Sequence, residues 1–232
     1  MNLRKHYDNL YKEAIQKIGS DNYQTDDLID SEYDARFGIT LLIRPDIFVC
    51  DRIQSFLTEL KNIEPYQYYY PSSDIHVTLM SIISCHEGFD LSHVSIMDYV
   101  EVVKKSIIGC KNIDVEFKGI TASPSCIMIQ GFLNGDTLNN IRNNLRINFK
   151  NSSLQQTIDE RYTIQTAHLT VVRFKKLFSR KTDFLKLIEK YRNYDFGVST
   201  IDTLDLVYND WYQRNANQKE LYRFSLNSID IG

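Results

Sequence analysis

Two short segments of the chain repeat one pattern of residue types. His76-Val77-Thr78-Leu79 and His168-Leu169-Thr170-Val171 each place a histidine two residues before a threonine, with apolar residues between and after them. In a β-strand alternate side chains lie on the same face, so the histidine and threonine point one way and the apolar pair points into a core. Each strand then presents a proton-transfer group beside a hydroxyl donor, and two of them can face each other across a cleft.

The pair of histidines suits a reaction that needs an acid and a base together. The ordinary pKa of imidazole lies near 6.5, so one ring can be neutral while the other is charged near neutral pH. We expect His76 and His168 to share the two roles, and the sequence does not decide which of them is the acid. The alternative is that both are ordinary histidines of half-buried strands.

The composition excludes several classes of function. With 232 residues, 43% of them apolar, the chain can bury the core of one large domain. The net charge of −3 argues against coating of long nucleic acid but leaves room for a local basic pocket. The N-terminus lacks the apolar core of a signal peptide, and no stretch is long enough for a membrane span. The four cysteines have no CxxC spacing and fit reduced thiols of a cytoplasmic protein. We further expect a monomer that has no membrane partner.

The periodicity of apolar residues and the turn signals predict the elements that position the two motifs. We expect a helix near the N-terminus, a strand at 37–43, a helix after Asp46, the first motif strand to about residue 83, a helix at 91–108, a hairpin of strands 113–120 and 126–132, a helix from 136 to about 149, the second motif strand at 167–174, a helix at 182–191, and strands at 200–208 and 221–226.

The predicted strands and helices follow a similar order in the two halves of the chain, and each half contains one motif strand. No flexible linker separates the halves. The sequence therefore predicts an α+β fold that is bilobal. Two pseudo-symmetric antiparallel-sheet lobes with flanking helices would enclose a central cleft that carries the two HxT strands. We assign residues 1–34 to an N-terminal helix and acidic connector, and residues 35–232 to the single bilobal domain.

The doubled H-x-T pattern resembles the two-histidine (2H) phosphoesterase superfamily, which includes bacterial RNA 2′,3′-cyclic phosphodiesterases and the related 2′-5′ RNA ligase-like proteins. The segment 36–45 resembles the opening strand of that family, and segments 115–120 and 126–131 resemble its middle hairpin. Arg173, five residues after the second histidine, matches an arginine that commonly follows the second motif. The resemblance covers about residues 35–228 and implies internal pseudo-twofold symmetry, hydrolysis of a cyclic phosphate and no metal requirement.

For that reaction we expect residues beside the histidines to bind the phosphate, and the alternatives are plain strand threonines and a surface arginine. Thr78 and Thr170 would donate hydrogen bonds to phosphate oxygens, and Arg173 would bind the phosphate through its guanidinium group. In a regular strand an offset of five residues places Arg173 on the face opposite the histidine, so it reaches the cleft only from a strand end or a β-bulge. The same offset from His76 leads to Ser81, so the two halves differ chemically.

Two further groups lie near the motifs. Tyr68 and Tyr70 precede the first motif and offer rings that can stack on a nucleobase, although packing within a strand explains them equally well. Arg142, Arg146 and Lys150 recur every four residues and form one basic face of a predicted helix, which either meets an anion or faces solvent.

The sequence contains no glycine-rich phosphate loop, no GxSxG elbow and no dinucleotide-binding fingerprint. Cys85, His86 and His93 are close in sequence but lack the spacing of zinc ligands. We therefore predict neither a metal site nor a cofactor.

Three functions stay open on the sequence alone. The leading one is a metal-independent phosphoesterase that acts on a nucleotide or short RNA with a 2′,3′-cyclic phosphate. The second is a non-catalytic nucleotide- or RNA-binding module of the same fold. The third is a mutarotase-like sugar anomer isomerase, whose usual all-β sandwich does not match the helix-rich pattern. We expect the loops at 21–34 and 209–219 to determine substrate choice.

Overall fold

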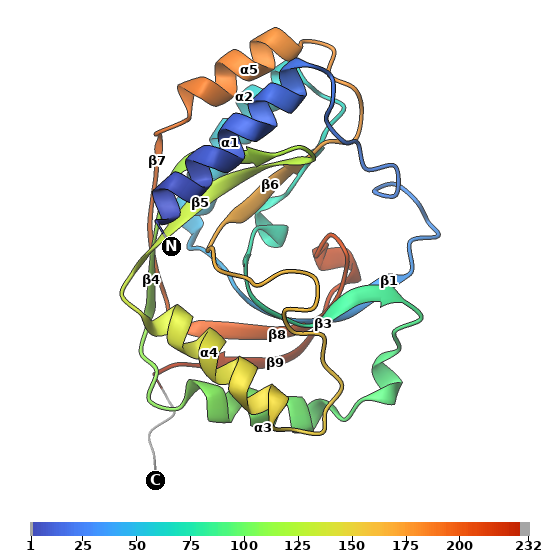
Figure 1. Cartoon of the computed structure of the whole chain (residues 1–232), viewed down its shortest axis with the longest axis vertical. Coiled ribbons are helices and arrows are strands. Elements are labelled where there is room, and N and C mark those ends of the chain that lie inside the picture. The colour runs from blue at the N-terminus through green and yellow to red at the C-terminus, as the bar shows by residue number, and fades with distance from the viewer. Residues whose placement is uncertain (1, 228–232) are drawn as a thin grey trace.

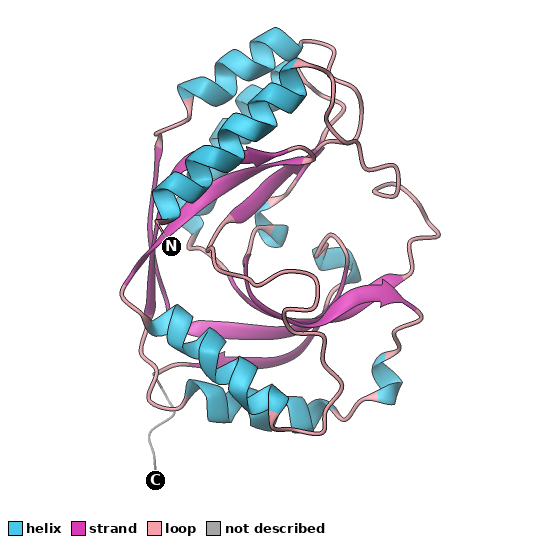
Figure 2. Cartoon of the chain, viewed as in Figure 1, coloured by secondary structure: helices cyan, strands magenta, loops and turns pink. Residues whose placement is uncertain are grey.

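Residues 2–227, which the computed structural model describes, contain nine strands in two antiparallel sheets (Figures 1 and 2). The four-stranded sheet has the order β3 (Val77–Glu87), β1 (Arg36–Ile43), β8 (Thr203–Asp210) and β9 (Lys219–Ser225). The five-stranded sheet has the order β2 (Tyr68–Tyr69), β6 (Leu169–Arg173), β5 (Cys126–Asn134), β4 (Ile113–Ser123) and β7 (Asp195–Ile201). The two motif strands, β3 and β6, thus lie in different sheets.

Five α-helices cover the two sheets. The helices α1 (Leu3–Gly19) and α2 (Ile47–Ile63) pack with the five-stranded sheet, and α5 (Lys181–Lys190) packs against these two helices. The helices α3 (Ile96–Ile107) and α4 (Thr137–Lys150) pack with the four-stranded sheet (Figure 1). Asp46 caps α2 as expected, because its carboxylate accepts a hydrogen bond of 2.9 Å from the backbone N–H of Val49.

The hydrophobic pattern explains how the strands are buried. In β4, for example, Val115 and Phe117 are fully buried, whereas Glu116 and Lys118 between them are partly exposed. This alternation places one face of the strand against the core. The apolar residues of both sheets and of the helices join one continuous core.

Most predicted elements are confirmed, and the α+β class with antiparallel sheets is confirmed with them. Two boundaries are wrong. The helix predicted at 91–108 begins at Ile96, after a 3₁₀ turn at Leu91–His93. The strand predicted at 200–208 is in fact the end of β7 and most of β8, which are separated by Asp202 alone. β7 pairs with β4 and β8 pairs with β1, so the chain passes from one sheet to the other at that residue. Asp202 and Thr203 are both exposed, which breaks the strand alternation there.

The N-terminal helix and the connector are in contact with the rest of the chain. α1 packs on β4, and Ile29 in the connector is buried. The last five residues of the domain assigned to 35–232 lie outside the described residues. Between residues 2 and 227, no helix combines the length and the apolar character that a membrane crossing requires.

Candidate active site

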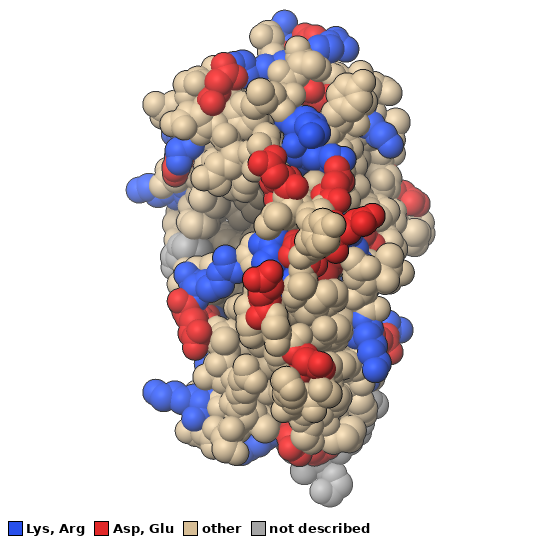
Figure 3. All heavy atoms as spheres, turned by 90° about the vertical axis from the view of Figure 1, so that its right-hand side faces the viewer, with Lys and Arg blue, Asp and Glu red and all other residues tan. Residues whose placement is uncertain are grey.

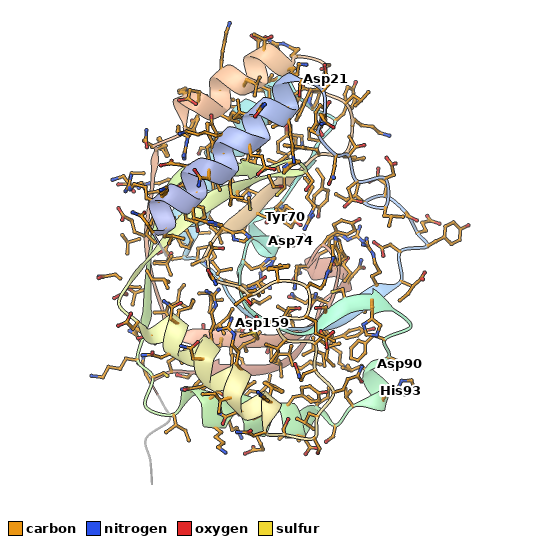
Figure 4. The ribbon with its side chains drawn as sticks, viewed as in Figure 1. Asp21, Tyr70, Asp74, Asp90, His93 and Asp159 are labelled. Carbon is orange, nitrogen blue, oxygen red and sulfur yellow. The ribbon has the colours of Figure 1, made fainter. Side chains whose placement is uncertain are left out.

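One cavity of about 250 Å³ is bordered by both motifs. His76, Thr78, His168, Thr170 and Arg173 all line it, although they come from two different sheets. Figure 4 shows two further lining residues, Tyr70 and Asp159, from opposite sides of the central space. The structure therefore brings together the five residues that the sequence places in a phosphate site.

A β-bulge explains how Arg173 reaches this cavity. In the pairing of β6 with β5, Val172 is opposite Ile127 and Thr170 is opposite Met128, which leaves Val171 as an extra residue. Val171 and Val172 are both fully buried. Because the bulge shifts the alternation by one residue, Thr170 and Arg173 share a face, whereas a regular strand would separate them.

The first motif strand contains the same irregularity at the same place. In the pairing of β3 with β1, Met80 is opposite Leu41 and Thr78 is opposite Leu42, so Leu79 is the extra residue. The bulge brings Ser81 to the face of Thr78, and Ser81 also lines the cavity. Each motif therefore continues as a histidine, a threonine two residues later, a bulge, and a third cavity residue.

The two histidines each have one ring nitrogen engaged by the protein. Nδ1 of His76 lies 2.7 Å from the carbonyl oxygen of Asp74, which only accepts, so this nitrogen carries a proton. Nδ1 of His168 lies 2.7 Å from the hydroxyl oxygen of Thr166. In both rings Nε2 is the nitrogen that is left for a ligand.

Both rings are neutral at neutral pH in the ligand-free protein. Burial in the cavity, followed by the charges of Arg44 and Arg173, lowers the pKa of His76 to about 4 despite the Asp74 carbonyl, which raises it. Burial also lowers the pKa of His168 to about 4, with the charges of Arg142 and His76 acting in the same direction. Since the charge of one ring lowers the pKa of the other, the two rings belong to one electrostatic site.

Arg173 has an environment suited to an anion. Its Nε donates a hydrogen bond of 2.9 Å to the hydroxyl of Tyr70, and its guanidinium lies 5.6 Å from the centre of the Tyr212 ring. Among residues 2–227 no carboxylate forms an ion pair with it. A largely enclosed cation without a carboxylate partner favours an anionic ligand.

Tyr68 and Tyr70 contact this arginine and each other. Tyr70 is almost fully buried, and the ring of Tyr68 packs edge-on against it with 5.0 Å between the ring centres. Tyr68 pairs with Arg173 across strands β2 and β6 and is not a lining residue of the cavity. Stacking of either ring on a base stays a prediction.

Arg142 does not belong to an exposed basic face, which corrects one of the two interpretations of the arginines in α4. Its side chain is 1% exposed and donates to the carbonyl oxygens of Leu79 at 2.9 Å, Thr78 at 3.0 Å and Thr166 at 2.8 Å. The first carbonyl belongs to the extra residue in the bulge of β3, the second to the residue before it, and the third to a residue two positions before His168. One guanidinium thus links the backbones of both motifs.

The sequence reasoning missed the loop between α4 and β6 as part of the site. Thr157, Asp159 and Arg161 of this loop line the cavity, and Thr157 attaches the loop to β3 through a hydrogen bond of 2.7 Å from the N–H of Ser84. No motif in the segment indicates this role. The loop at 209–219 differs, because it contains the single tryptophan of the chain, a residue type that often lies in binding sites. Trp211 does line the cavity.

Trp211 also borders a neighbouring hollow, together with Tyr33 of the connector. The guanidinium groups of Arg36 and Arg161 each lie 4.5 Å from the ring centre of Trp211. Acidic and basic side chains occur side by side around a hollow on the face of the molecule shown in Figure 3. Both loops that were expected to determine substrate choice therefore contribute residues to the cavity or to the hollow beside it.

Within residues 2–227 no group of three or more His, Cys, Asp or Glu side chains is arranged to hold a metal ion. His93, one of the residues considered for such a site, lies at the periphery with Asp90 (Figure 4).

No protein-family model matches the chain, and no curated protein matches it in sequence. Solved structures do match it. TT0787 of Thermus thermophilus has a TM-score of 0.57 at 12% identity, over 81% of this chain and 97% of that one. E. coli LigT complexed with 3′-AMP has a TM-score of 0.57 at 10% identity, over 83% and 99%. ATU0111 from Agrobacterium tumefaciens has a TM-score of 0.56 at 14% identity, over 89% and 96%.

A structure described as a phosphoesterase also matches, with a TM-score of 0.56 at 10% identity, over 82% of this chain and 98% of that chain. These likenesses concern the fold, which is the fold of LigT and of that phosphoesterase. The fold that the resemblance in the sequence implies is thereby confirmed.

Proposed function

We propose that the chain is a metal-independent phosphoesterase that hydrolyses a 2′,3′-cyclic phosphate, at the end of an RNA or on a nucleotide. The observation that carries the proposal is that the two HxT motifs line the same cavity as Arg173, which forms no ion pair with a carboxylate of residues 2–227. Similarity in fold to a phosphoesterase supports the same chemistry. LigT structures that contain 3′-AMP or ATP support a nucleotide as the ligand.

In this proposal His76 and His168 are the general acid and base. The oxygen of a water molecule forms a bond to phosphorus while one of its protons passes to Nε2 of a neutral imidazole. The bond from phosphorus to one ribose oxygen breaks, and that oxygen receives a proton from Nε2 of the other, protonated imidazole. The product is a phosphomonoester, and the two rings exchange protonation states with solvent before the next cycle.

Thr78, Thr170 and Arg173 would stabilise the charge on the non-bridging phosphate oxygens. The bound phosphate would also raise the pKa of the nearby rings, which supplies the protonated imidazole that the ligand-free site lacks at neutral pH. The two sheets would then act as pseudo-symmetric lobes of one site, since each contributes a motif strand with a bulge in the same position.

Turnover of 2′,3′-cyclic CMP in the presence of a chelator tests the proposal. The variants His76→Ala and His168→Ala should each lose about 10²- to 10⁴-fold in rate, the range of general acid–base catalysis. His93→Ala, which removes an exposed peripheral histidine, is the matched control and should keep full activity. Binding of the nucleotide without turnover would instead identify a binding module, and near-full turnover in either site variant would refute the assignment.

A further inference from the structure

Thr40 of β1 adds a further hydroxyl group to the cavity wall that carries the first motif. Its neighbours Ile39 and Leu41 are fully buried in the core, so the Thr40 side chain lies on the other face of the strand. Thr40 is opposite Ser81 in the pairing of β1 with β3, and both residues line the cavity. Because side chains that are paired across two strands share a face, the two hydroxyl groups belong to one wall.

A series of hydrogen bonds between side chains leads from Arg44 to the Thr40 hydroxyl. Nη2 of Arg44, the residue after β1, donates to Oε1 of Gln218 at 2.7 Å. Nε2 of Gln218 donates to Oε1 of Gln213 at 3.3 Å. Nε2 of Gln213 then donates to Oγ1 of Thr40 at 3.1 Å. Both glutamines lie in the loop between β8 and β9.

The cation at the start of the series fixes the direction of each bond. A guanidinium group only donates, so Gln218 turns its carbonyl oxygen to Arg44 and its NH₂ group to Gln213. Gln213 must then turn its carbonyl oxygen to Gln218 and its NH₂ group to Thr40. The hydroxyl oxygen of Thr40 is therefore the acceptor of this last bond, and the hydroxyl proton is left to donate elsewhere.

The protein supplies no acceptor for that proton. Among residues 2–227 the bond from Gln213 is the single hydrogen bond of the Thr40 side chain, which is only 3% exposed. A buried hydroxyl without an acceptor costs free energy, which an oxygen atom of a ligand recovers. The same cavity is lined by Arg173 and by the two motif threonines, so a phosphate oxygen is the acceptor that suits it.

The pairing of the strands places Thr40 where the first lobe lacks a charge. Thr40 pairs with Ser81 in one sheet as Cys126 pairs with Arg173 in the other. Ser81, which corresponds to Arg173, is neutral. A hydroxyl whose proton is directed by a neighbouring amide would supply the second lobe-specific donor to a phosphate that lies between the two sheets.

We propose that Thr40 is a further phosphate-binding residue of this cavity. Gln213 and Gln218 are positioning residues, because they keep the Thr40 proton turned away from themselves and available to the phosphate. The proposal rests on the proposed function in one respect only, namely that the ligand of the cavity carries a phosphate group. It does not depend on turnover.

The backbone of Gln213 supports a role for its side chain. Its φ of 61° lies in the left-handed region that favours glycine, and its N–H donates to the carbonyl oxygen of Asp210 at 3.2 Å to close the turn after β8. Glycine would adopt this conformation at a lower cost but has no amide to orient Thr40. A strained residue beside a cavity fits a side chain whose hydrogen bonds are required there.

Arg44 contributes the direction of the series and not a second free charge. Its Nε lies 3.4 Å from a carboxylate oxygen of Asp205, and its Nη1 donates to the carbonyl oxygen of Ser73 at 2.6 Å. These contacts hold the guanidinium group in place, while the carboxylate offsets its charge. The effect of Arg44 on Thr40 is therefore the orientation of the two amides.

Binding of inorganic phosphate, measured by isothermal titration calorimetry at neutral pH, tests the proposal without a substrate. Thr40→Val removes the hydroxyl but keeps the branched shape, and it should weaken phosphate binding about 10-fold, as loss of a hydrogen bond to a charged group does. Thr40→Ser keeps the hydroxyl and should restore most of the affinity. Thr203→Val, at an exposed position of β8 in the same sheet, is the matched control and should bind like the wild type. Thermal unfolding shows that each variant is folded.

A double-mutant cycle tests the positioning role of Gln213. Gln213→Met alone should weaken phosphate binding by about threefold, since the Thr40 hydroxyl remains but is no longer oriented. Added to Thr40→Val, the same substitution should cost nothing more, because its effect passes through the missing hydroxyl. Losses that simply add in the double variant would show that Gln213 acts independently, and would overturn its positioning role.

Two ligands and one assay distinguish the remaining outcomes. Equal phosphate affinity of Thr40→Val and the wild type overturns the proposal, as does a loss that is seen with 3′-CMP but not with inorganic phosphate, or absence of phosphate binding by the wild type. Turnover of 2′,3′-cyclic CMP is measured in parallel. If the wild type binds phosphate through Thr40 but does not turn over the cyclic nucleotide, the phosphoesterase function fails and the Thr40 proposal stands. If turnover occurs and phosphate binding ignores Thr40, only the Thr40 proposal fails.

Discussion

Ser81 and Arg173 occupy corresponding positions in the two motif strands. Each follows its threonine by three residues, each comes two residues after the extra residue of a β-bulge, and both line the same cavity. The backbone geometry is therefore repeated, while the side chain is a neutral hydroxyl in one strand and a cation in the other. Of these two corresponding positions, only the one in β6 carries a charge.

This difference predicts unequal effects of substitution. Arg173→Leu should lower kcat/KM for a cyclic nucleotide by about 10²- to 10³-fold, because it removes the only cation at these paired positions that can stabilise charge on the phosphate. Ser81→Ala should change it by less than about threefold, since a neutral hydroxyl contributes less than a charged donor. Steady-state kinetics of the two variants would check this, and a larger loss in Ser81→Ala than in Arg173→Leu would contradict it.

The lowered pKa values predict how an anion binds. Both rings have a pKa of about 4 without a ligand, so protonation of either ring becomes possible only as the pH falls well below neutrality. A bound anion favours the charged imidazole and raises the pKa, and by linkage the anion must bind more tightly as the pH falls from neutral toward 4. Sulfate is a suitable probe because its charge is constant in this range. NMR titration of His76 and His168 with and without sulfate measures the shift, and identical titration curves would disprove it.

Arg142 should contribute to the stability of the protein through the hydrogen bonds of its guanidinium group. Replacing it by Met removes three hydrogen bonds to backbone carbonyls in the interior, so the free energy of unfolding should fall by about 3–5 kcal/mol. Lys150→Met on the same helix is the control, since Lys150 is exposed, and its effect should stay within about 0.5 kcal/mol. Urea denaturation monitored by tryptophan fluorescence gives both values. Equal stability of the two variants would show that Arg142 does not link the motifs.

Gly131 allows a close approach that any side chain would prevent. Gly131→Ala should push the chain away at Ala167, reduce stability by about 1–3 kcal/mol and lower kcat by displacing His168. Gly19→Ala provides the comparison, because nothing lies within 4 Å of a Cβ at that position. Thermal unfolding and turnover of the two variants test this difference. Equal stability and equal kcat of the two variants would show that β5 can move away from Ala167 at no cost in free energy.

The sequence predicts the site as far as local patterns extend. The two HxT segments, their strand context and most helices follow from alternation and capping, and these are properties of neighbouring residues. The bulge in β6 could be inferred only as a condition for Arg173 to reach the cleft. Its existence depends on the pairing of Val171 and Val172 with β5, which no local pattern specifies.

The features that were missed depend on contacts between distant segments. Arg142 repeats with Arg146 and Lys150 at helical spacing, so the sequence alone cannot tell that the first of them faces the interior. Asp202 has no turn signal strong enough to divide a strand, and the division arises because β7 and β8 pair with different partners. The contact of the Tyr7 hydroxyl with the Gly131 backbone joins two parts of the chain that no periodicity relates.

The order in which the chain visits the two sheets has a consequence for its integrity. It enters the four-stranded sheet with β1, moves to the other with β2, and returns with β3. It moves again with β4, β5 and later β6 and β7, and ends in the first sheet with β8 and β9 (Figure 1). A cut anywhere between Glu87 and Asp195 therefore leaves each fragment with strands of both sheets and with neither sheet complete. Neither half of the cavity can therefore be expressed or exchanged as a separate module. Two complementary fragments would have to reassemble before both sheets, and the cavity between them, were complete.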